Sequence, residues 1–457
     1  MPSPSPLMLS ISGVRGVIGG SLTPDVASRY AAAFGSWLKT KLAGDTAPHV
    51  VIGRDSRPSG EMIESAAVAG LLAVGCRVTR IGIATTPGVA IMVDELGGDG
   101  GMVVTASHNP IIWNGLKALR SDGVAPPADE ANEIIRRFRE SDIDWTDVHA
   151  MQEIERSEEL PRIHRDRILR HLDVAAIREA KLKIVLDSVC GAGGEETRAL
   201  LDELGVELVH LHGEPTGQFP HEPEPTAENL VSLSDEVPRH AAAIGFAQDP
   251  DADRLAVVDE RGRYIGEEYT LALCAKHVLS GGQKAVANLS TSRMLDDIAG
   301  AVGAEVVRTP VGEANVAAAM KADGAAIGGE GNGGVIWPEV GLVRDSLVGI
   351  AILLEMLAKR KQPLSVIAGE IPAYAIVKEK VPASEALIAQ LGPKMTEAFA
   401  DQRIDTQDGV RVDWADRWVH VRPSNTEPIV RLIAEARDAE QAKAIIAEVR
   451  GALGLTG

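Results

Sequence analysis

The sequence predicts an α/β protein with three similar α/β domains, whose sheets are mixed but mostly parallel, and a smaller C-terminal α+β domain. A pattern of strand, loop, helix and second strand begins near residues 49, 183 and 285. Strands that alternate with helices favour parallel sheets covered by helices. From about residue 371 the strands become short and alternating, and the chain ends in a long helix-periodic stretch. With 457 residues, 45% of them apolar, the chain can bury several cores.

The composition shifts along the chain predict where the domains begin and end. We expect domains over residues 1–150, 151–258, 259–370 and 371–457. The charged segment 128–172 has helical periodicity and is predicted to join the first domain to the second by helices.

The charge balance limits the kinds of partner that the protein can bind. Lys and Arg total 46 against 65 Asp and Glu, a net charge of −19. Such a surface repels nucleic acid and anionic membranes, so neither is an expected partner. An anionic substrate would need a locally basic pocket.

Cysteine usage and the N-terminal sequence indicate the compartment. Cys76, Cys190 and Cys274 are scattered, with neither the spacing of a zinc site nor that of a disulfide framework. The first residues, MPSPSPLMLS, lack a signal-peptide pattern, and no apolar run reaches the ~18 residues of a membrane helix. We therefore expect a soluble cytoplasmic protein.

The first motif, VVTASHNP at residues 103–110, ends an apolar strand with Ser107 and His108. A loop at the end of such a strand points into a crevice. A plain turn is the alternative, because Ser, Asn and Pro all form turns. A hydrolase triad is disfavoured: G-x-S-x-G is absent, and a His adjacent in sequence to its Ser usually cannot reach the hydroxyl.

The second motif is GFAQDPDADRLAVVD, residues 245–259, where Asp249, Asp251 and Asp253 alternate. In an extended chain these three carboxylates would point to the same side. Holding three negative charges together is unfavourable without a cation. A hard ion such as Mg²⁺, with positions left for phosphate oxygens, is the favoured interpretation. An EF-hand is a poorer match, because Arg254 stands where the loop needs Gly and the flanks look like strands. An acidic surface loop is weakened by the apolar runs on both sides.

The third motif is AAIGGEGNGGVIWP, residues 325–338. It satisfies G-x-G-x-x-G, but β-like residues and Pro338 follow where a dinucleotide fold needs a helix. Glu330 and Asn332 instead suit hydrogen bonds to adjacent hydroxyls, as on a sugar. A tight turn is an equally good explanation of the motif taken alone.

The fourth motif is VRPSNTEPIVRL, residues 421–432. It combines a guanidinium, hydroxyls, an amide and turn N–H groups in one loop, which is typical of a phosphate-binding site. These residues are Arg422, Ser424, Asn425 and Thr426, with Arg431 further along. Ser-Asn-Thr-Glu before an apolar run can also cap a helix, and both roles can hold together.

Taken together, the four motifs resemble one family, the α-D-phosphohexomutases, over nearly the whole chain. They occur in the family's order: TASHNP with NGLK (Asn114 to Lys117), DPDADR, the loop GGEGNGG and RPSNTEP. SISGVRG at residues 10–16 is similar to the family's opening loop. The resemblance implies three α/β domains and a fourth, TATA-binding-protein-like domain around a central cleft, with one motif from each.

The resemblance also implies the roles of the site residues. Ser107 would be carried as a phosphoserine, with one Mg²⁺ held between its phosphate and the three aspartates. Arg15 and Arg254 would stabilise charge, and Lys117 with His108 would carry protons. The implied substrate-binding residues are Glu330, Asn332, Arg422, Ser424, Asn425, Thr426 and Arg431. Arg57 and Arg293 are further basic residues in or beside these loops.

The implied reaction moves a phosphoryl group between carbon 1 and carbon 6 of a hexose phosphate, through a sugar bisphosphate that also serves as activator. GGEGNGG with SISGVRG is similar to the archaeal-type phosphoglucosamine mutase branch, which favours glucosamine 6-phosphate to glucosamine 1-phosphate. Phosphomannomutase/phosphoglucomutase activity is the alternative. A non-catalytic sugar-phosphate-binding protein is a third hypothesis, disfavoured by the intact Ser107 and aspartates. A monomer or a homodimer is expected.

Overall fold

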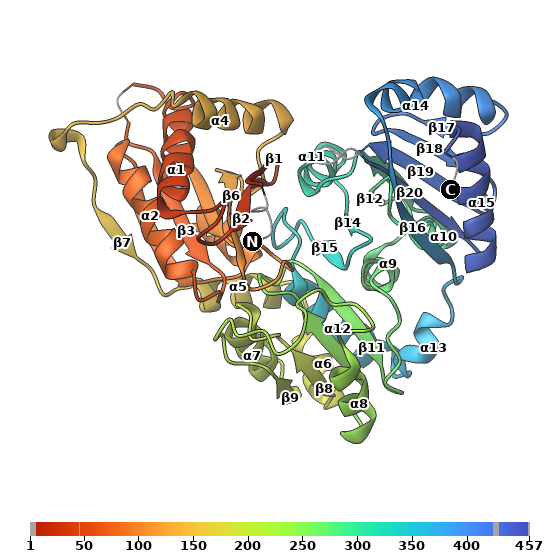
Figure 1. Cartoon of the computed structure of the whole chain (residues 1–457). Coiled ribbons are helices and arrows are strands. Elements are labelled where there is room, and N and C mark those ends of the chain that lie inside the picture. The colour runs from red at the N-terminus through yellow and green to blue at the C-terminus, as the bar shows by residue number, and fades with distance from the viewer. Residues whose placement is uncertain (1–5, 45, 424–428, 456–457) are drawn as a thin grey trace.

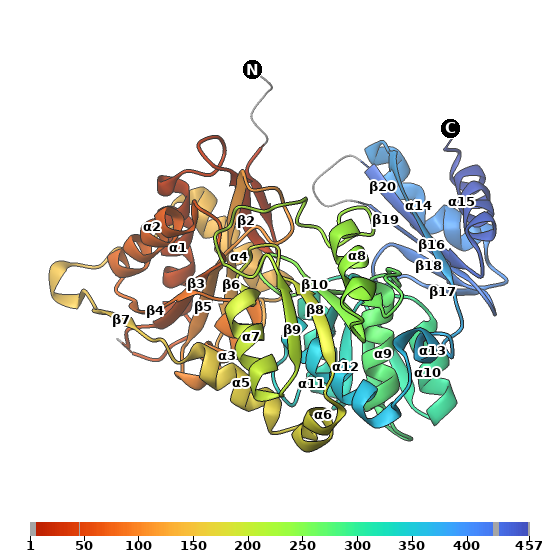
Figure 2. The ribbon, with the colours of Figure 1, turned by 90° about the horizontal axis from the view of Figure 1, so that it is seen from below.

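The computed structural model describes residues 6–44, 46–423 and 429–455. Figure 1 shows four sheet-containing domains, with the first and the last on opposite sides and the second at the base between them. Seen from below, in Figure 2, helices lie beside the sheets, some on the outside of the molecule and some between the domains. No helix within the described ranges is long and apolar enough to cross a membrane.

The first domain contains a seven-stranded sheet of order β1-β2-β6-β5-β3-β4-β7. Its central strands β4, β3 and β5 run parallel, and β6 is antiparallel to β5. The strands are β1 (Met8–Ser10), β2 (Gly13–Val17), β3 (His49–Arg54), β4 (Arg77–Ile83), β5 (Gly100–Val104), β6 (Trp113–Arg120) and β7 (Ile154–Arg156).

The second and third sheets repeat the centre of the first. Their orders are β11-β10-β8-β9 and β15-β14-β12-β13, which match β6-β5-β3-β4 strand for strand. In each, the outer hairpin strand is antiparallel and the rest are parallel. The strands are β8 (Lys183–Asp187), β9 (Glu207–Leu211), β10 (Ile244–Gln248), β11 (Leu255–Asp259), β12 (Lys284–Asn288), β13 (Glu305–Thr309), β14 (Ile327–Glu330) and β15 (Gly334–Ile336). The predicted fold class, with three similar mixed sheets, is confirmed.

Alternating side chains bury both faces of the first sheet. Val50 and Ile52 of β3 pack under one layer of helices, and Val51 between them packs under the other. The first layer is α1 (Pro24–Lys39), α2 (Gly60–Ala73) and α4 (Ala128–Glu140); the second is α3 (Thr86–Glu95).

The remaining helices of the first three domains follow the same strand–helix alternation. They are α5 (Leu160–Leu169), α6 (Val174–Ala180), α7 (Gly193–Glu203), α8 (Val231–Arg239), α9 (Glu268–Val278), α10 (Met294–Val302), α11 (Glu313–Asp323), α12 (Ser346–Arg360) and α13 (Leu364–Ala368). A short 3₁₀ helix, η1, spans Val148–Ala150.

The fourth domain is an antiparallel five-stranded sheet of order β16-β20-β19-β18-β17, packed against two helices. Its strands are β16 (Ala375–Pro382), β17 (Arg403–Asp405), β18 (Val410–Asp413), β19 (Trp418–Pro423) and β20 (Ile429–Ala436); its helices are α14 (Glu385–Ala398) and α15 (Ala439–Leu453). The predicted α+β character is confirmed. The sequence reading did not identify α14 or β17.

The connection over residues 128–172 differs from the expectation of helices alone. Between α4 and α5 the chain extends and adds β7 to the edge of the first sheet, parallel to β4. Periodicity could not reveal this strand, because all three of its residues are exposed. The second domain is therefore tied to the first by backbone hydrogen bonds as well as by helix packing.

Candidate active site

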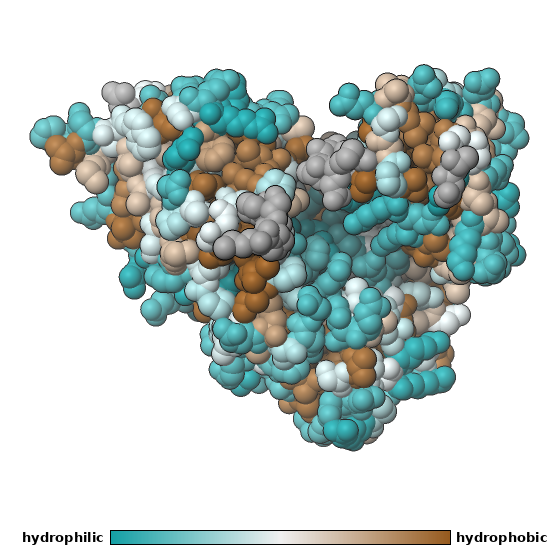
Figure 3. All heavy atoms as spheres, in the orientation of Figure 1, coloured by the Kyte–Doolittle hydropathy of each residue, from teal (hydrophilic) through white to brown (hydrophobic). Residues whose placement is uncertain are grey.

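The first three predicted motifs lie at the carboxyl ends of strands, where parallel sheets expose ligand-binding loops. Ser107 follows β5, Asp249 follows β10, and Glu330 ends β14. Figure 3 shows hydrophilic side chains lining the hollow between the first and fourth domains.

Ser107 lies in a tight, buried turn. Its φ is 49°, and only 2% of the residue is exposed. Its Oγ donates to Oδ2 of Asp249 at 2.8 Å, and its N–H donates to Thr105 Oγ1 at 2.9 Å. The fold thus joins two residues 142 positions apart in the sequence.

The Arg57 side chain lies inside the Ser107 turn and not in the cleft. Its guanidinium donates to the carbonyls of Ser107 at 2.5 Å and Asn109 at 2.6 Å, and also to those of Pro110 and Trp113. Asp55 holds it with a 3.0 Å ion pair, and neither side chain is exposed. A planar donor fork can satisfy several carbonyls at once, which explains an arginine here.

The three aspartates converge, but not as extended chain. Residues 250–253 form a turn, with Ala252 at φ 54°, so the expectation of extended alternation is wrong. The turn still brings one oxygen of each carboxylate within 4.8 Å of the others, and all three residues are fully buried. Strands β10 and β11 flank the turn, whereas an EF-hand needs helices.

The donor set of this cluster fits a divalent cation. Among the residues that the structure describes, Oδ1 of Asp251 and Oδ1 of Asp253 have no hydrogen-bond partner. Buried carboxylate oxygens without partners are costly. Burial, together with Asp251 and Asp253, raises the pKa of Asp249 well above its usual value. A hard cation would satisfy these oxygens and let all three carboxyls ionise.

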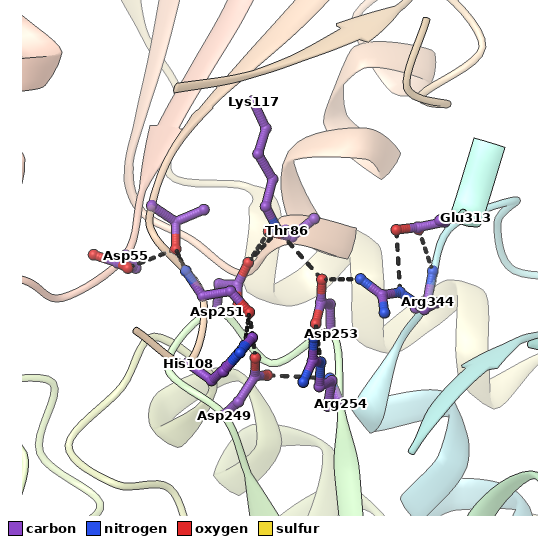
Figure 4. Close-up of polar contacts among 12 residues, drawn as sticks. Asp55, Thr86, His108, Lys117, Asp249, Asp251, Asp253, Arg254, Glu313 and Arg344 are labelled. Carbon is purple, nitrogen blue, oxygen red and sulfur yellow. Dashed lines mark hydrogen bonds and ion pairs between the residues drawn. The ribbon is translucent and has the colours of Figure 1, made fainter. Parts of the chain in front are cut away.

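Two basic side chains already neutralise part of this charge (Figure 4). Lys117 Nζ lies 2.6 Å from Asp251 Oδ2 and 3.2 Å from Asp253 Oδ2, and Arg344 Nη2 lies 2.7 Å from the same Asp253 oxygen. Burial lowers the pKa of Lys117, but Asp251 and Asp253 outweigh it, so the net shift is upward. Lys117 is therefore charged at neutral pH.

His108 reaches the serine despite being adjacent in sequence. Its Nδ1 lies 3.3 Å from Ser107 Oγ, so the expectation that neighbours cannot meet is wrong here, because the left-handed turn at Ser107 folds the chain back. Burial, followed by Arg254 and Arg15, lowers the pKa of His108 to about 3. The imidazole is thus neutral at physiological pH. Its nearest carboxylate, Glu224, lies 3.9 Å from Nε2.

Arg15 and Arg254 also lie at the Ser107 turn. Arg15 Nη1 donates to Asn109 Oδ1 at 3.1 Å, and the Arg254 backbone N–H donates to Asp249 Oδ1 at 3.1 Å. The charges of both guanidinium groups act on His108, next to the serine.

Glu330 and Asn332 line a second part of the hollow, a pocket of about 310 Å³. Glu330 is mostly buried, with Oε1 accepting from Asn288 at 2.8 Å and Oε2 from Arg344 at 2.9 Å. Asn332 Nδ2 lies 3.4 Å from the same Oε2. Glu330 therefore has strong protein partners as well as a face on the pocket.

Arg422 and Arg431 line the same pocket from the fourth domain, although Arg422 also pairs with Asp408 at 3.2 Å. Ser424, Asn425 and Thr426 lie outside the described residues. Arg293 is not a pocket residue: its guanidinium donates to the Ala415 carbonyl at 2.7 Å, between the third and fourth domains.

Sequence reasoning missed several residues of the site. Arg344 links Asp253, Glu330 and Glu313, and so connects the aspartate cluster to the pocket. Thr86 donates to Asp251 at 2.6 Å. Neither stands in a recognisable motif: Thr86 begins α3, and Arg344 lies in the loop just before α12.

Comparison with known proteins identifies the family of the chain. Phosphoglucomutase/phosphomannomutase domain families match in order: alpha/beta/alpha domain I over residues 8–144, domain II over 163–262, domain III over 267–374 and the C-terminal domain over 374–452. Together they cover most of the chain.

Similar whole proteins have the same architecture. A Thermococcus kodakarensis protein named phosphoglucomutase/phosphomannomutase is 39% identical over 94% of this chain and 95% of its own length. A probable phosphoglucosamine mutase from Methanopyrus kandleri is 37% identical over 94% of each chain. The crystal structure of a phosphoglucomutase/phosphomannomutase family protein from Burkholderia thailandensis matches with a TM-score of 0.84 and 31% identity, covering 98% of both chains. The chain belongs to the phosphoglucomutase/phosphomannomutase family.

Proposed function

We propose that this phosphohexomutase interconverts glucosamine 6-phosphate and glucosamine 1-phosphate, with Ser107 as the phosphoryl carrier. One observation carries the assignment of Ser107: its buried hydroxyl lies 2.8 Å from Asp249, within a carboxylate cluster that has unsatisfied oxygens. A structural serine would not need such a neighbour, whereas a phosphoryl carrier needs a cation site next to it.

The phosphoryl group moves in two balanced steps. First, a sugar hydroxyl attacks the phosphorus on Ser107, the Oγ–P bond breaks, and a sugar bisphosphate forms. After the bisphosphate turns over in the hollow, Ser107 Oγ attacks the other phosphate, and the sugar is released as a monophosphate. Escaped bisphosphate can rephosphorylate Ser107, which makes it an activator.

Asp249, Asp251 and Asp253 would hold one Mg²⁺. When bound, the ion neutralises charge on the transferring phosphoryl group. Arg15 and Arg254, which already lie at the Ser107 turn, would add positive charge where the phosphate sits.

Two side chains with opposite protonation states would transfer the protons of the reaction. His108, neutral and 3.3 Å from Ser107 Oγ, can accept a proton. Lys117, charged by its aspartate neighbours, can donate one.

The pocket would bind the rest of the substrate. Glu330 and Asn332 suit sugar hydroxyls, and Arg422 and Arg431 suit the phosphate that is not being transferred. Because the sugar turns over between steps, both phosphates must fit this pocket in turn, which favours flexible arginine side chains over a rigid cage.

The choice of sugar rests on GGEGNGG and SISGVRG, and on relatives such as the probable phosphoglucosamine mutase of Methanopyrus kandleri. Phosphomannomutase/phosphoglucomutase activity is a second candidate, favoured by the name of the 39% identical Thermococcus protein.

A mutase assay on glucosamine, mannose and glucose 6-phosphates, each primed with its bisphosphate, tests the choice. We expect the highest kcat/KM with glucosamine; a preference for mannose or glucose would support the second candidate. Turnover of none of them, with a mass unchanged by phosphatase treatment, would instead indicate a sugar-phosphate-binding protein.

A further inference from the structure

A second cluster of metal-ligating side chains lies in the second domain, apart from the aspartate triplet. Asp187 ends β8 and is 1% exposed as a side chain. His212 Nδ1 lies 3.0 Å from its Oδ1, and His221 Nε2 lies 3.1 Å from its Oδ2. One ligand atom from each residue falls within 4.8 Å of the other two.

The hydrogen bonding of His221 requires a positive charge next to Asp187, carried either by the ring or by a bound ion. Its Nδ1 lies 2.8 Å from the carbonyl oxygen of Glu222, so Nδ1 must carry a hydrogen. In a neutral ring Nε2 then presents a lone pair to Asp187 Oδ2, which is also an acceptor. Either the ring is doubly protonated or a cation lies between the two atoms. A backbone carbonyl on the far ring nitrogen is typical of metal-bound histidines.

The geometry of the cluster suits a metal ion. Ligand atoms at roughly 2.0–2.2 Å from one tetrahedral metal sit roughly 3.3–3.6 Å apart, so a small outward movement of the side chains would open the contacts found here for an ion. The histidine side chains are 32% and 18% exposed, which leaves a path for the ion and room for water ligands.

The backbone around the cluster is strained. Val189, Cys190 and His212 all have positive φ, at 47°, 53° and 49°. A β-branched residue rarely adopts this conformation, so the surrounding structure must compensate for it. An ion that links Asp187 to His212 would supply part of that compensation.

We propose that Asp187, His212 and His221 bind a borderline divalent metal ion of the Zn²⁺ class, separate from the ion at the aspartate triplet. Imidazole ligands select such ions over Mg²⁺, which prefers oxygen. The proposal does not depend on which reaction the protein catalyses.

The position of this site gives it a structural role. His212 and His221 bracket a loop that packs on the first domain: Phe219 lies 4.9 Å from the Arg57 guanidinium, which holds the Ser107 turn. Cys190, next to the cluster, accepts a 2.7 Å hydrogen bond from Ser56 through its carbonyl oxygen. A bound ion would therefore stiffen the surface on which the Ser107 turn rests.

The test is a Zn²⁺ titration of the full chain, without a polyhistidine tag and with Mg²⁺ saturating, followed by calorimetry and metal analysis. We expect one Zn²⁺ per chain, and more than about 100-fold weaker binding in His212→Gln and in His221→Gln. His240→Gln is the matched control, because His240 pairs with Glu236 on the surface. Asp251→Asn should keep the Zn²⁺ site.

Two results would overturn the proposal. Wild-type protein that binds no Zn²⁺ would mean that a protonated His221 explains the contacts. Equal Zn²⁺ binding by wild type and both glutamine variants would place the ion elsewhere. Cooperative thermal unfolding of the metal-free variants checks that they fold, and the visible spectrum of bound Co²⁺ reports nitrogen ligation directly in the wild-type protein.

Discussion

The first three domains share a large apolar cluster in addition to smaller clusters of their own, whereas the core of the fourth is separate. A continuous cluster of buried side chains runs from Val51 in the first domain, through Ile184 in the second, to Ile371 at the end of the third. The core of the fourth domain consists of residues from Val381 to Leu453. The chain is therefore one block of three domains with a separately packed fourth.

Polar contacts join the first three domains to one another and also join the fourth domain to the third. His164 joins the second and third domains. Its side chain is fully buried, with Nδ1 3.0 Å from Glu196 and Nε2 2.7 Å from Asp345. Contacts to the fourth domain include exposed ones, such as Lys378 with Glu267 at 2.8 Å, and buried or partly buried ones, such as the Arg411 guanidinium with the Leu289 carbonyl and Ser290 with His420 at 2.8 Å.

If the residues act as proposed, this difference in core packing separates the chemical step from the binding of the phosphate that is not being transferred. Ser107 and the aspartates are positioned inside the shared block, where packing leaves little freedom. Arg422 and Arg431 lie on the fourth domain, which can shift by exchanging polar contacts without opening a core. Changes at the Ser107 turn or in the core of the block should thus alter kcat or stability, and changes on the fourth domain should alter KM.

The largest expected effect is that of Ser107→Ala. Removing the proposed phosphoryl carrier should lower kcat by more than about 10⁴-fold, with substrate affinity retained. A coupled mutase assay and calorimetry with sugar phosphate measure the two quantities. Normal turnover by this variant would refute the mechanism.

The buried His164 makes the shared block sensitive to high pH. Burial lowers its pKa, but Asp345 and Glu196 outweigh burial and raise the pKa to about 10. Because the pKa is higher in the folded state than the ~6.5 of an unfolded chain, this stabilisation is complete below that pH and is lost as pH rises through about 10. The loss should be on the order of several kcal/mol.

Urea unfolding of the wild type and of His164→Gln between pH 6.5 and pH 10 measures that loss. We expect the wild type to lose more unfolding free energy than the variant across this range. Nitrogen-15 spectra of the wild-type imidazole provide a check that needs no variant, and a ring that deprotonates near neutral pH would contradict the expectation.

Arg57→Lys tests whether the Ser107 turn needs its guanidinium. Lysine cannot satisfy the four carbonyls, and lost hydrogen bonds to a charged group cost roughly 1.5–3 kcal/mol, so kcat should fall by about 10–100-fold. KM should change little. Arg54→Lys is the control, since Arg54 pairs with Glu61 and Glu64 rather than with the turn. A larger fall in kcat in the Arg54→Lys control would show that the Ser107 turn does not limit catalysis.

The smallest effect is expected on the fourth domain. Arg431→Lys keeps the charge but loses the bidentate fork, so KM should rise by about tenfold with kcat nearly unchanged. Arg437→Lys, at an exposed position after β20, is the control. A fall in kcat alone would show that the fourth domain contributes to the chemical step.

Sequence reasoning performed best where the signal was local. Strand starts near residues 49, 183 and 285 match β3, β8 and β12, because buried strands need runs of β-branched residues. It failed at β7, whose residues are all exposed, and at the contact between His108 and Ser107, which depends on one left-handed residue. Residue type gives little indication of whether an exposed segment forms a strand or whether a residue adopts the left-handed conformation.

By itself, the sequence determined the residue chemistry, the order of the motifs and the repeated strand–helix pattern. Only the tertiary structure decided that Arg344 joins two motifs, that Arg57 lies inside the Ser107 turn, and that Asp187 meets two histidines. The reason is physical: such contacts form between residues far apart in the chain, where packing and burial, rather than local propensity, select the partner.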